Sequence, residues 1–174
     1  MEITFKNKLS NDFSILLLVC FDGKTVDQKA FNNDNIKENF EILIDTKEFK
    51  NNKSYSDDFN IKSNNSFKKI NISRISSLRT VTDIERFAGK KFSEIERKKN
   101  LKVSVIVEEK NIGEIQYEEI IASLASGFNL KNYSFRKYRS KVRPIHASID
   151  KITFITNNPD KVEKKFKYFE KISQ

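Results

Sequence analysis

One stretch of the chain, residues 126–144, combines cations with aromatic side chains and is the segment whose residue types best suit binding. Aromatic rings can stack on bases while lysine and arginine neutralise phosphates, so the stretch could bind nucleic acid or another acidic partner. Alternatively, the rings anchor the segment in the core and the cations are only solvated. The aromatic residues are Tyr133, Phe135 and Tyr138, and the cations are Arg136, Lys137, Arg139, Lys141 and Arg143.

Residues suited to nucleophilic catalysis or metal binding are few. His146 is the only histidine, and no Gly-x-Ser-x-Gly turn exists to present a serine to it, so we expect no serine triad. Acidic pairs could hold a divalent metal, but adjacent side chains point in different directions, so we expect solvated faces and predict no catalytic or metal residue. The pairs are Asp57-Asp58, Glu108-Glu109 and Glu118-Glu119.

The glycines do not form a phosphate-binding loop. An α/β protein usually binds nucleotides where clustered glycines let backbone amides approach phosphates. Here the four glycines are scattered, and the turn after the third long strand, 73–78, contains none. We therefore predict no cofactor in this chain, and ADP-ribose binding would rest on fold analogy alone. The glycines are Gly23, Gly89, Gly113 and Gly127.

Composition indicates one folded, basic domain spanning 1–174. A chain of 174 residues is long enough to build a core. Its residues are 37% apolar and 33% charged, and it contains too many aromatic residues for a disordered protein. The formal charge of +9 favours acidic partners such as DNA, although lysines spread over helix faces would give the same total.

Cys20 is the only cysteine and lies in the apolar run 15–21. A disulfide framework is impossible, so we expect a buried thiol and a cytoplasmic location. The run is far shorter than the roughly 20 residues of a membrane span, so we expect a buried strand and no membrane association.

Alternating strand and helix patterns predict an α/β/α sandwich around a mixed, largely parallel sheet. We expect strands near 2–6, 15–21, 67–75, 103–107 and 148–156, with a short edge strand near 59–62 in an otherwise looped region, 47–65. Helices are expected after residue 35 and from a capping box formed by Thr82 and Glu85 up to the basic residues 97–99. A third helix is expected after Gly113 with Phe128 on its apolar face, and a fourth from Pro159 with Ile172 facing inward.

The spacing Gly127-x-x-Leu130-x-x-Tyr133-x-Phe135-x-x-Tyr138-Arg139-Ser140-Lys141 resembles a signature of leucyl aminopeptidases, the M17 peptidase family. That signature reads Glu-Gly-x-x-Leu-x-x-Tyr-Arg-Phe-Asp-x-Tyr-Lys-Ser and lies in the family's N-terminal domain. The opening strand, the helix near 80–98 and the final strand and helix follow the same order, so the resemblance extends over the whole chain.

The resemblance implies a macro-domain-like fold. It also implies that this domain's partner is a C-terminal catalytic domain of the same protein. In this family that catalytic domain holds two divalent metals, zinc or manganese, and the enzyme is a cytoplasmic hexamer that releases N-terminal amino acids from peptides. Its Asn-Thr-Asp-Ala-Glu-Gly-Arg metal-binding segment does not occur here. The resemblance therefore implies a non-catalytic domain that serves assembly or active-site access, with a basic nucleic-acid-binding module as the alternative.

Three departures from the signature change its polar residues. Ser126, Ser134 and Arg136 stand where the family has Glu, Arg and Asp. The aromatic positions are kept, so we expect Tyr133, Phe135 and Tyr138 to lock the passage from helix to strand into the core.

Overall fold

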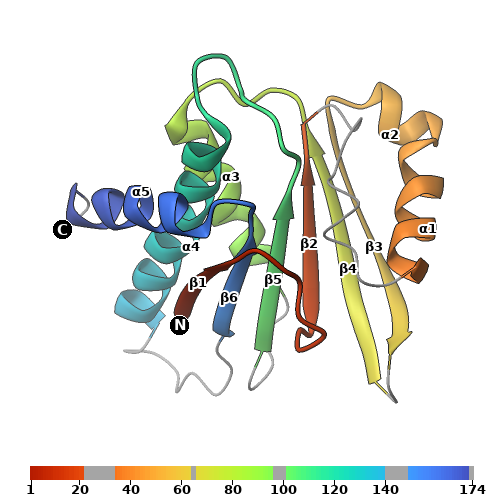
Figure 1. Cartoon of the computed structure of the whole chain (residues 1–174), viewed down its shortest axis with the longest axis horizontal. Coiled ribbons are helices and arrows are strands. Elements are labelled where there is room, and N and C mark those ends of the chain that lie inside the picture. Colours follow the sequence, from red (N-terminus) through yellow and green to blue (C-terminus); the bar gives the residue numbers. More distant parts are fainter. Residues whose placement is uncertain (22–33, 64–65, 96–100, 140–148, 173–174) are drawn as a thin grey trace.

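The computed structural model describes residues 1–21, 34–63, 66–95, 101–139 and 149–172, with the backbone alone for 63, 66 and 134–139. Within these ranges it contains six strands and five helices (Figure 1). The strands are β1 (Glu2–Lys6), β2 (Ile15–Cys20), β3 (Ser54–Ser63), β4 (Ser66–Ile75), β5 (Leu101–Val107) and β6 (Ile149–Ile155). The helices are α1 (Asp34–Ile44), α2 (Lys47–Asn51), α3 (Val81–Glu94), α4 (Tyr117–Arg139) and α5 (Pro159–Ile172).

The six strands form one mixed sheet in the order β1-β6-β5-β2-β4-β3. All neighbours run parallel except β3, which pairs antiparallel with β4. β2 lies near the middle of the sheet, and its residues are at most 6% exposed because helices cover both of its faces. The predicted three-layer α/β fold with a mixed, largely parallel sheet is confirmed.

Alternate residues of β2 belong to the two cores. Ile15, Leu17 and Val19 pack on the side of α3, α4 and α5, whereas Leu16 and Leu18 pack on the side of α1 and α2 (Figure 1). Successive strand side chains point to opposite faces, so this one apolar run supplies both layers. Cys20 is not in a disulfide and is fully buried, as predicted.

The layer of α1 and α2 is tied to the sheet by Arg74. Its guanidinium donates to the backbone oxygens of Phe49, Lys50 and Asn52 at 2.9, 3.2 and 2.6 Å. These carbonyls end the short helix α2 and would otherwise lack intrahelical partners. The region predicted as loop therefore contains a helix, and the expected short edge strand is a full strand of 10 residues, β3.

The capping box of α3 lies two residues earlier than predicted. The Thr80 hydroxyl accepts from the Asp83 amide at 3.1 Å, and the Asp83 carboxylate accepts from the Thr80 amide at 3.0 Å. Asp83 takes the place expected for a glutamate because its shorter side chain still reaches the N-cap amide. The prediction of Thr82 and Glu85 is wrong in register.

Helix α4 continues 11 residues beyond Phe128, through a region predicted to be a connection. Tyr133 is 65% exposed and Leu130 40% exposed, so the prediction that Tyr133 anchors this segment in the core is wrong. The helix carries no proline, and one glycine does not break it because packing against α3 stabilises it. In α5, Val162 and Phe166 face inward as predicted, but Ile172 is 64% exposed.

Gly127 lies where α4 crosses α3. A Cβ atom at this position would stand 2.4 Å from the Glu85 backbone oxygen and 2.7 Å from the Ala88 Cβ. Beside it, the Ser126 hydroxyl donates to the Glu85 carboxylate at 2.8 Å. The crossing therefore requires glycine on steric grounds, and Ser126 adds a polar contact across it.

Candidate functional site

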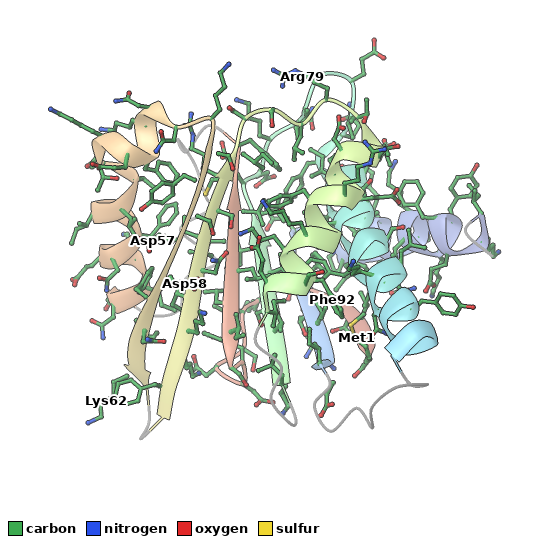
Figure 2. The ribbon with its side chains drawn as sticks, turned by 180° about the vertical axis from the view of Figure 1, so that it is seen from behind. Met1, Asp57, Asp58, Lys62, Arg79 and Phe92 are labelled. Carbon is green, nitrogen blue, oxygen red and sulfur yellow. The ribbon has the colours of Figure 1, made fainter. Side chains whose placement is uncertain are left out.

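The strand pair β3–β4 has a polar face on the side of α3. In the antiparallel register, Ser56 lies opposite Ser73, Asp58 opposite Asn71, and Asn60 opposite Lys69. Directly opposed side chains on one face of a strand pair interact, so these residues form a polar ladder. On this side α3 and α4 lie over β5 and β6, while no described helix covers β3 and β4 (Figure 2).

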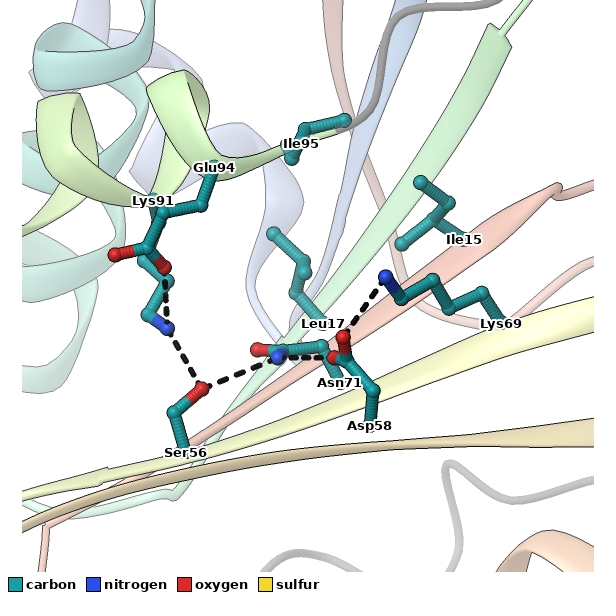
Figure 3. Close-up of a pocket in the computed structure, with 9 residues that line it drawn as sticks. All are labelled: Ile15, Leu17, Ser56, Asp58, Lys69, Asn71, Lys91, Glu94 and Ile95. Carbon is teal, nitrogen blue, oxygen red and sulfur yellow. Dashed lines mark hydrogen bonds and ion pairs between the residues drawn. The ribbon is translucent and has the colours of Figure 1, made fainter.

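A groove of about 110 Å³ lies between this polar ladder and the C-terminal end of α3 (Figure 3). Ile15 and Leu17 of β2, together with Ile95 after α3, supply its apolar lining. Its polar lining comes from both strands and the helix: Ser56, Asp58, Lys69, Asn71, Lys91 and Glu94. We refer to these nine residues as the α3–β4 groove.

The polar residues of the α3–β4 groove form one continuous chain of contacts (Figure 3). Lys91 Nζ donates to Glu94 Oε2 at 2.8 Å and to Ser56 Oγ at 2.9 Å. Asn71 Nδ2 donates to Ser56 Oγ at 3.2 Å and to Asp58 Oδ1 at 2.6 Å. The ion pair of Lys69 Nζ with Asp58 Oδ2 at 2.8 Å ends the chain.

Burial differs along this chain of contacts. The Lys91 side chain is 9% exposed, so its ammonium depends on Glu94 and Ser56 for partners. The Lys69 and Asp58 side chains are 38% and 45% exposed and remain accessible from the groove. Partial burial raises the pKa of Asp58, but the hydrogen bonds from Lys69 and Asn71 outweigh it, so the pKa lies below its ordinary value.

A second hollow of about 320 Å³ continues along α3 toward the start of that helix. It shares Ser56, Lys91 and Glu94 with the α3–β4 groove and adds the cations Arg74, Arg86 and Lys90. The two hollows therefore adjoin each other, and hydroxyl groups and charges of both signs line them.

The basic segment predicted to bind acidic partners is not brought into this site by any described contact. Arg136, Lys137 and Arg139 belong to the last turns of α4, where only the backbone is described. Lys141 and Arg143, like His146, lie outside the described residues, as do the side chains of Phe135 and Tyr138. Nucleic-acid binding by this segment stays a prediction.

Two of the acidic residues expected on solvated faces are buried instead. Glu108 is 1% exposed, and its carboxylate accepts from the Phe21 amide at 2.7 Å, which links the ends of β5 and β2. Glu118 is 9% exposed and pairs with Lys161 Nζ at 2.8 Å. Across the described ranges, no three histidine, cysteine or acidic side chains are grouped so that they could hold a metal ion. None of the described helices has the length and apolar character needed to cross a membrane.

Sequence reasoning missed the α3–β4 groove, although a signal was present. In β3 the residues at 54, 56, 58 and 60 are all polar, and in β4 those at 69, 71 and 73 are polar. This period-two pattern predicts one polar face on each strand. It does not reveal that the two faces meet, because their register depends on the hairpin.

Comparison with known proteins supports the fold only. The chain matches no model of a known protein family and no curated protein. Among solved structures it is similar to a mutant of tomato leucine aminopeptidase, with a TM-score of 0.58 and 14% sequence identity. The match covers 98% of this chain and 35% of that chain, so this chain spans about a third of the length of that enzyme.

Proposed function

We propose that the chain is a non-catalytic domain of a leucyl-aminopeptidase-like protein and acts in assembly or in shaping access to a catalytic domain. The observation that carries this proposal is the extent of the structural match, which takes in nearly all of this chain and 35% of an aminopeptidase chain. A domain of this kind contributes a surface, and the chemistry belongs to the rest of the protein.

Two further observations support a non-catalytic role. The family's metal-binding segment does not occur in the sequence, and Gly127 of the signature serves the crossing of α4 and α3. In the proposed protein, a catalytic domain would hold two divalent metals, zinc or manganese, and the complete molecule would be a cytoplasmic homo-oligomer, such as a hexamer.

The test compares the 174 residues alone with the complete gene product that contains them, purified from its own source with anything bound to it. We expect manganese- or zinc-dependent release of leucine from a leucyl amide by the complete product or complex, and none by the isolated 174 residues. Metal-dependent hydrolysis by the isolated chain would overturn the non-catalytic assignment. A complete product without peptidase activity and without a peptidase partner would overturn the link to aminopeptidases.

A further inference from the structure

We propose that the α3–β4 groove binds a small zwitterion, an aliphatic α-amino acid. The proposal rests on the groove alone and does not depend on the link to aminopeptidases. Its carrying observation is that two ammonium groups, two carboxylates and three aliphatic side chains line one hollow of about 110 Å³.

The signs of the lining charges exclude simpler ligands. A phosphate or another plain anion would meet the carboxylates of Asp58 and Glu94 in the same groove, and a metal ion would meet the ammonium groups of Lys69 and Lys91. The four charges sum to zero, because two lysines stand against two acidic residues. A ligand that presents one positive and one negative group can satisfy both kinds of lining residue.

The groove has bonding capacity left for such a ligand. An ammonium group has three donors, and a carboxylate has about four acceptor positions. Lys69 uses one of its donors on Asp58, and Asp58 accepts from Lys69 and from Asn71. The side chains of Lys69 and Asp58 both stay partly exposed, so their remaining donors and acceptors can reach a ligand. The ligand's carboxylate would bind Lys69, and its ammonium would bind Asp58.

Size and apolar lining narrow the ligand to an α-amino acid. The groove is smaller than a cavity of about 150 Å³, which holds benzene, so it can take the charged end and the first side-chain atoms of a small ligand while the rest of the ligand extends out of it. In so small a space the two charges of the ligand must be close together, as they are on the α-carbon of a free amino acid. Ile15, Leu17 and Ile95 would then contact an aliphatic side chain, and the adjoining hollow of about 320 Å³ leaves room for a longer one.

The buried Lys91 prepares the groove for binding. Its ammonium is held by Glu94 and Ser56 before any ligand arrives, so the wall formed by α3 is already oriented. A preorganised polar wall lowers the ordering cost of binding. Ser56 and Asn71 then connect this wall to Asp58 and Lys69 on the strands.

The experiment titrates the chain with L-leucine and with two analogues that each lack one charge, 3-methylbutylamine and 4-methylpentanoate, and follows amide resonances by NMR. We expect saturable shifts of resonances in the α3–β4 groove with leucine, and binding of each analogue that is weaker by about tenfold or more. No saturable shift with leucine, isoleucine or valine up to about 10 mM would overturn the proposal. Equal binding of leucine and either analogue would overturn the zwitterion assignment.

Two variants separate recognition from folding. Asp58→Asn and Lys69→Met each remove one accessible charge and preserve much of the side-chain shape, so the fold should persist. We expect each to weaken leucine binding about tenfold, and we expect Asp58→Asn to abolish the preference for leucine over 4-methylpentanoate. The control is Lys167→Met on α5, where the ion pair of Lys167 with Glu163 lies away from the groove. Unchanged leucine binding in folded Asp58→Asn and Lys69→Met proteins would contradict the proposal.

Discussion

Helix α3 has two neighbours that hold it by opposite means. Toward α4 the contact is close-packed, since Gly127 admits the Glu85 backbone with no room for a methyl group. Toward β3 and β4 the contact is polar and hollow, and Lys91 reaches across it to Ser56. One side of the helix therefore defines its position, while the other side leaves space beside it that a ligand can fill.

The contrast distinguishes the α3–α4 contact, which stabilises the fold, from the contacts that line the α3–β4 groove. Shape complementarity in a close-packed contact tolerates little change, because interiors are packed like organic crystals. Partly exposed ion pairs contribute little to stability, so they can be rearranged at small cost. Substitutions on the two sides of α3 should therefore differ in size and in kind.

The largest effect is expected at the centre of the packed side. Phe128 is 2% exposed and contacts the rings of Phe92 and Phe154 at 5.9 and 6.0 Å between centroids. Phe128→Ala should lower the free energy of unfolding by about 3–5 kcal/mol, through lost burial and a remaining cavity. Urea denaturation followed by circular dichroism measures this loss. A loss no larger than that of a surface substitution would show that the α3–α4 side is not the tightly packed one.

Gly127→Ala tests the helix crossing itself. The added methyl group meets backbone and a buried Cβ, and overpacking of this kind costs about 1–3 kcal/mol. The matched control is Gly89→Ala on α3, where the nearest atom to a new Cβ is 3.8 Å away. Because alanine favours helix over glycine by up to about 1 kcal/mol, this control should be neutral or stabilising. Equal destabilisation by both substitutions would contradict the steric account.

Thr80→Ala removes the hydroxyl of the capping box at the start of α3. The Asp83 amide then loses its acceptor, so the free energy of unfolding should fall by about 1 kcal/mol. Thr82→Ala is the control, since Thr82 is exposed and lies inside the helix. Thermal unfolding of both variants decides which threonine is the cap, and a larger loss from Thr82→Ala would place the box where the sequence predicted it.

The smallest effect is expected from Asp58→Asn on the polar side. Because the pKa of Asp58 is lowered in the folded chain, its ionised form adds stability above the ordinary aspartate pKa, and this stability is lost as pH falls through the folded value. The free energy of unfolding of the wild type should exceed that of the variant by about 0.2–1 kcal/mol at neutral pH, and this difference should shrink as the pH falls below the ordinary aspartate pKa. Urea midpoints measured across this range test the sign. A difference between wild type and Asp58→Asn that grows toward low pH would contradict this sign. The control is Asp57→Asn, a change at the neighbouring residue of the same strand.

The pattern of apolar residues in the sequence made several strands of the sheet predictable. The run Ile15–Phe21 predicted a strand buried on both faces, and alternation in 67–75 predicted β4, because both signals are local. The full length of α4 was not predicted, because glycine disfavours helix locally and the close contact of Gly127 with α3 is a tertiary feature. The α3–β4 groove depends on the register of β3 and β4 and on Lys91 and Glu94 in the last turn of α3, which lie 20 or more residues after Asn71. No single window of sequence contains this arrangement.

The pairing of β1 with β6 has a consequence for the order of folding. Glu2 lies beside Lys151 and Lys6 beside Ile155, so β1 pairs with a strand that is synthesised 149 residues later. At about 5–20 residues per second, β1 waits roughly 7 to 30 seconds for its neighbour. During synthesis β1 has no described strand to pair with, and the sheet can be completed at this edge only when β6 arrives.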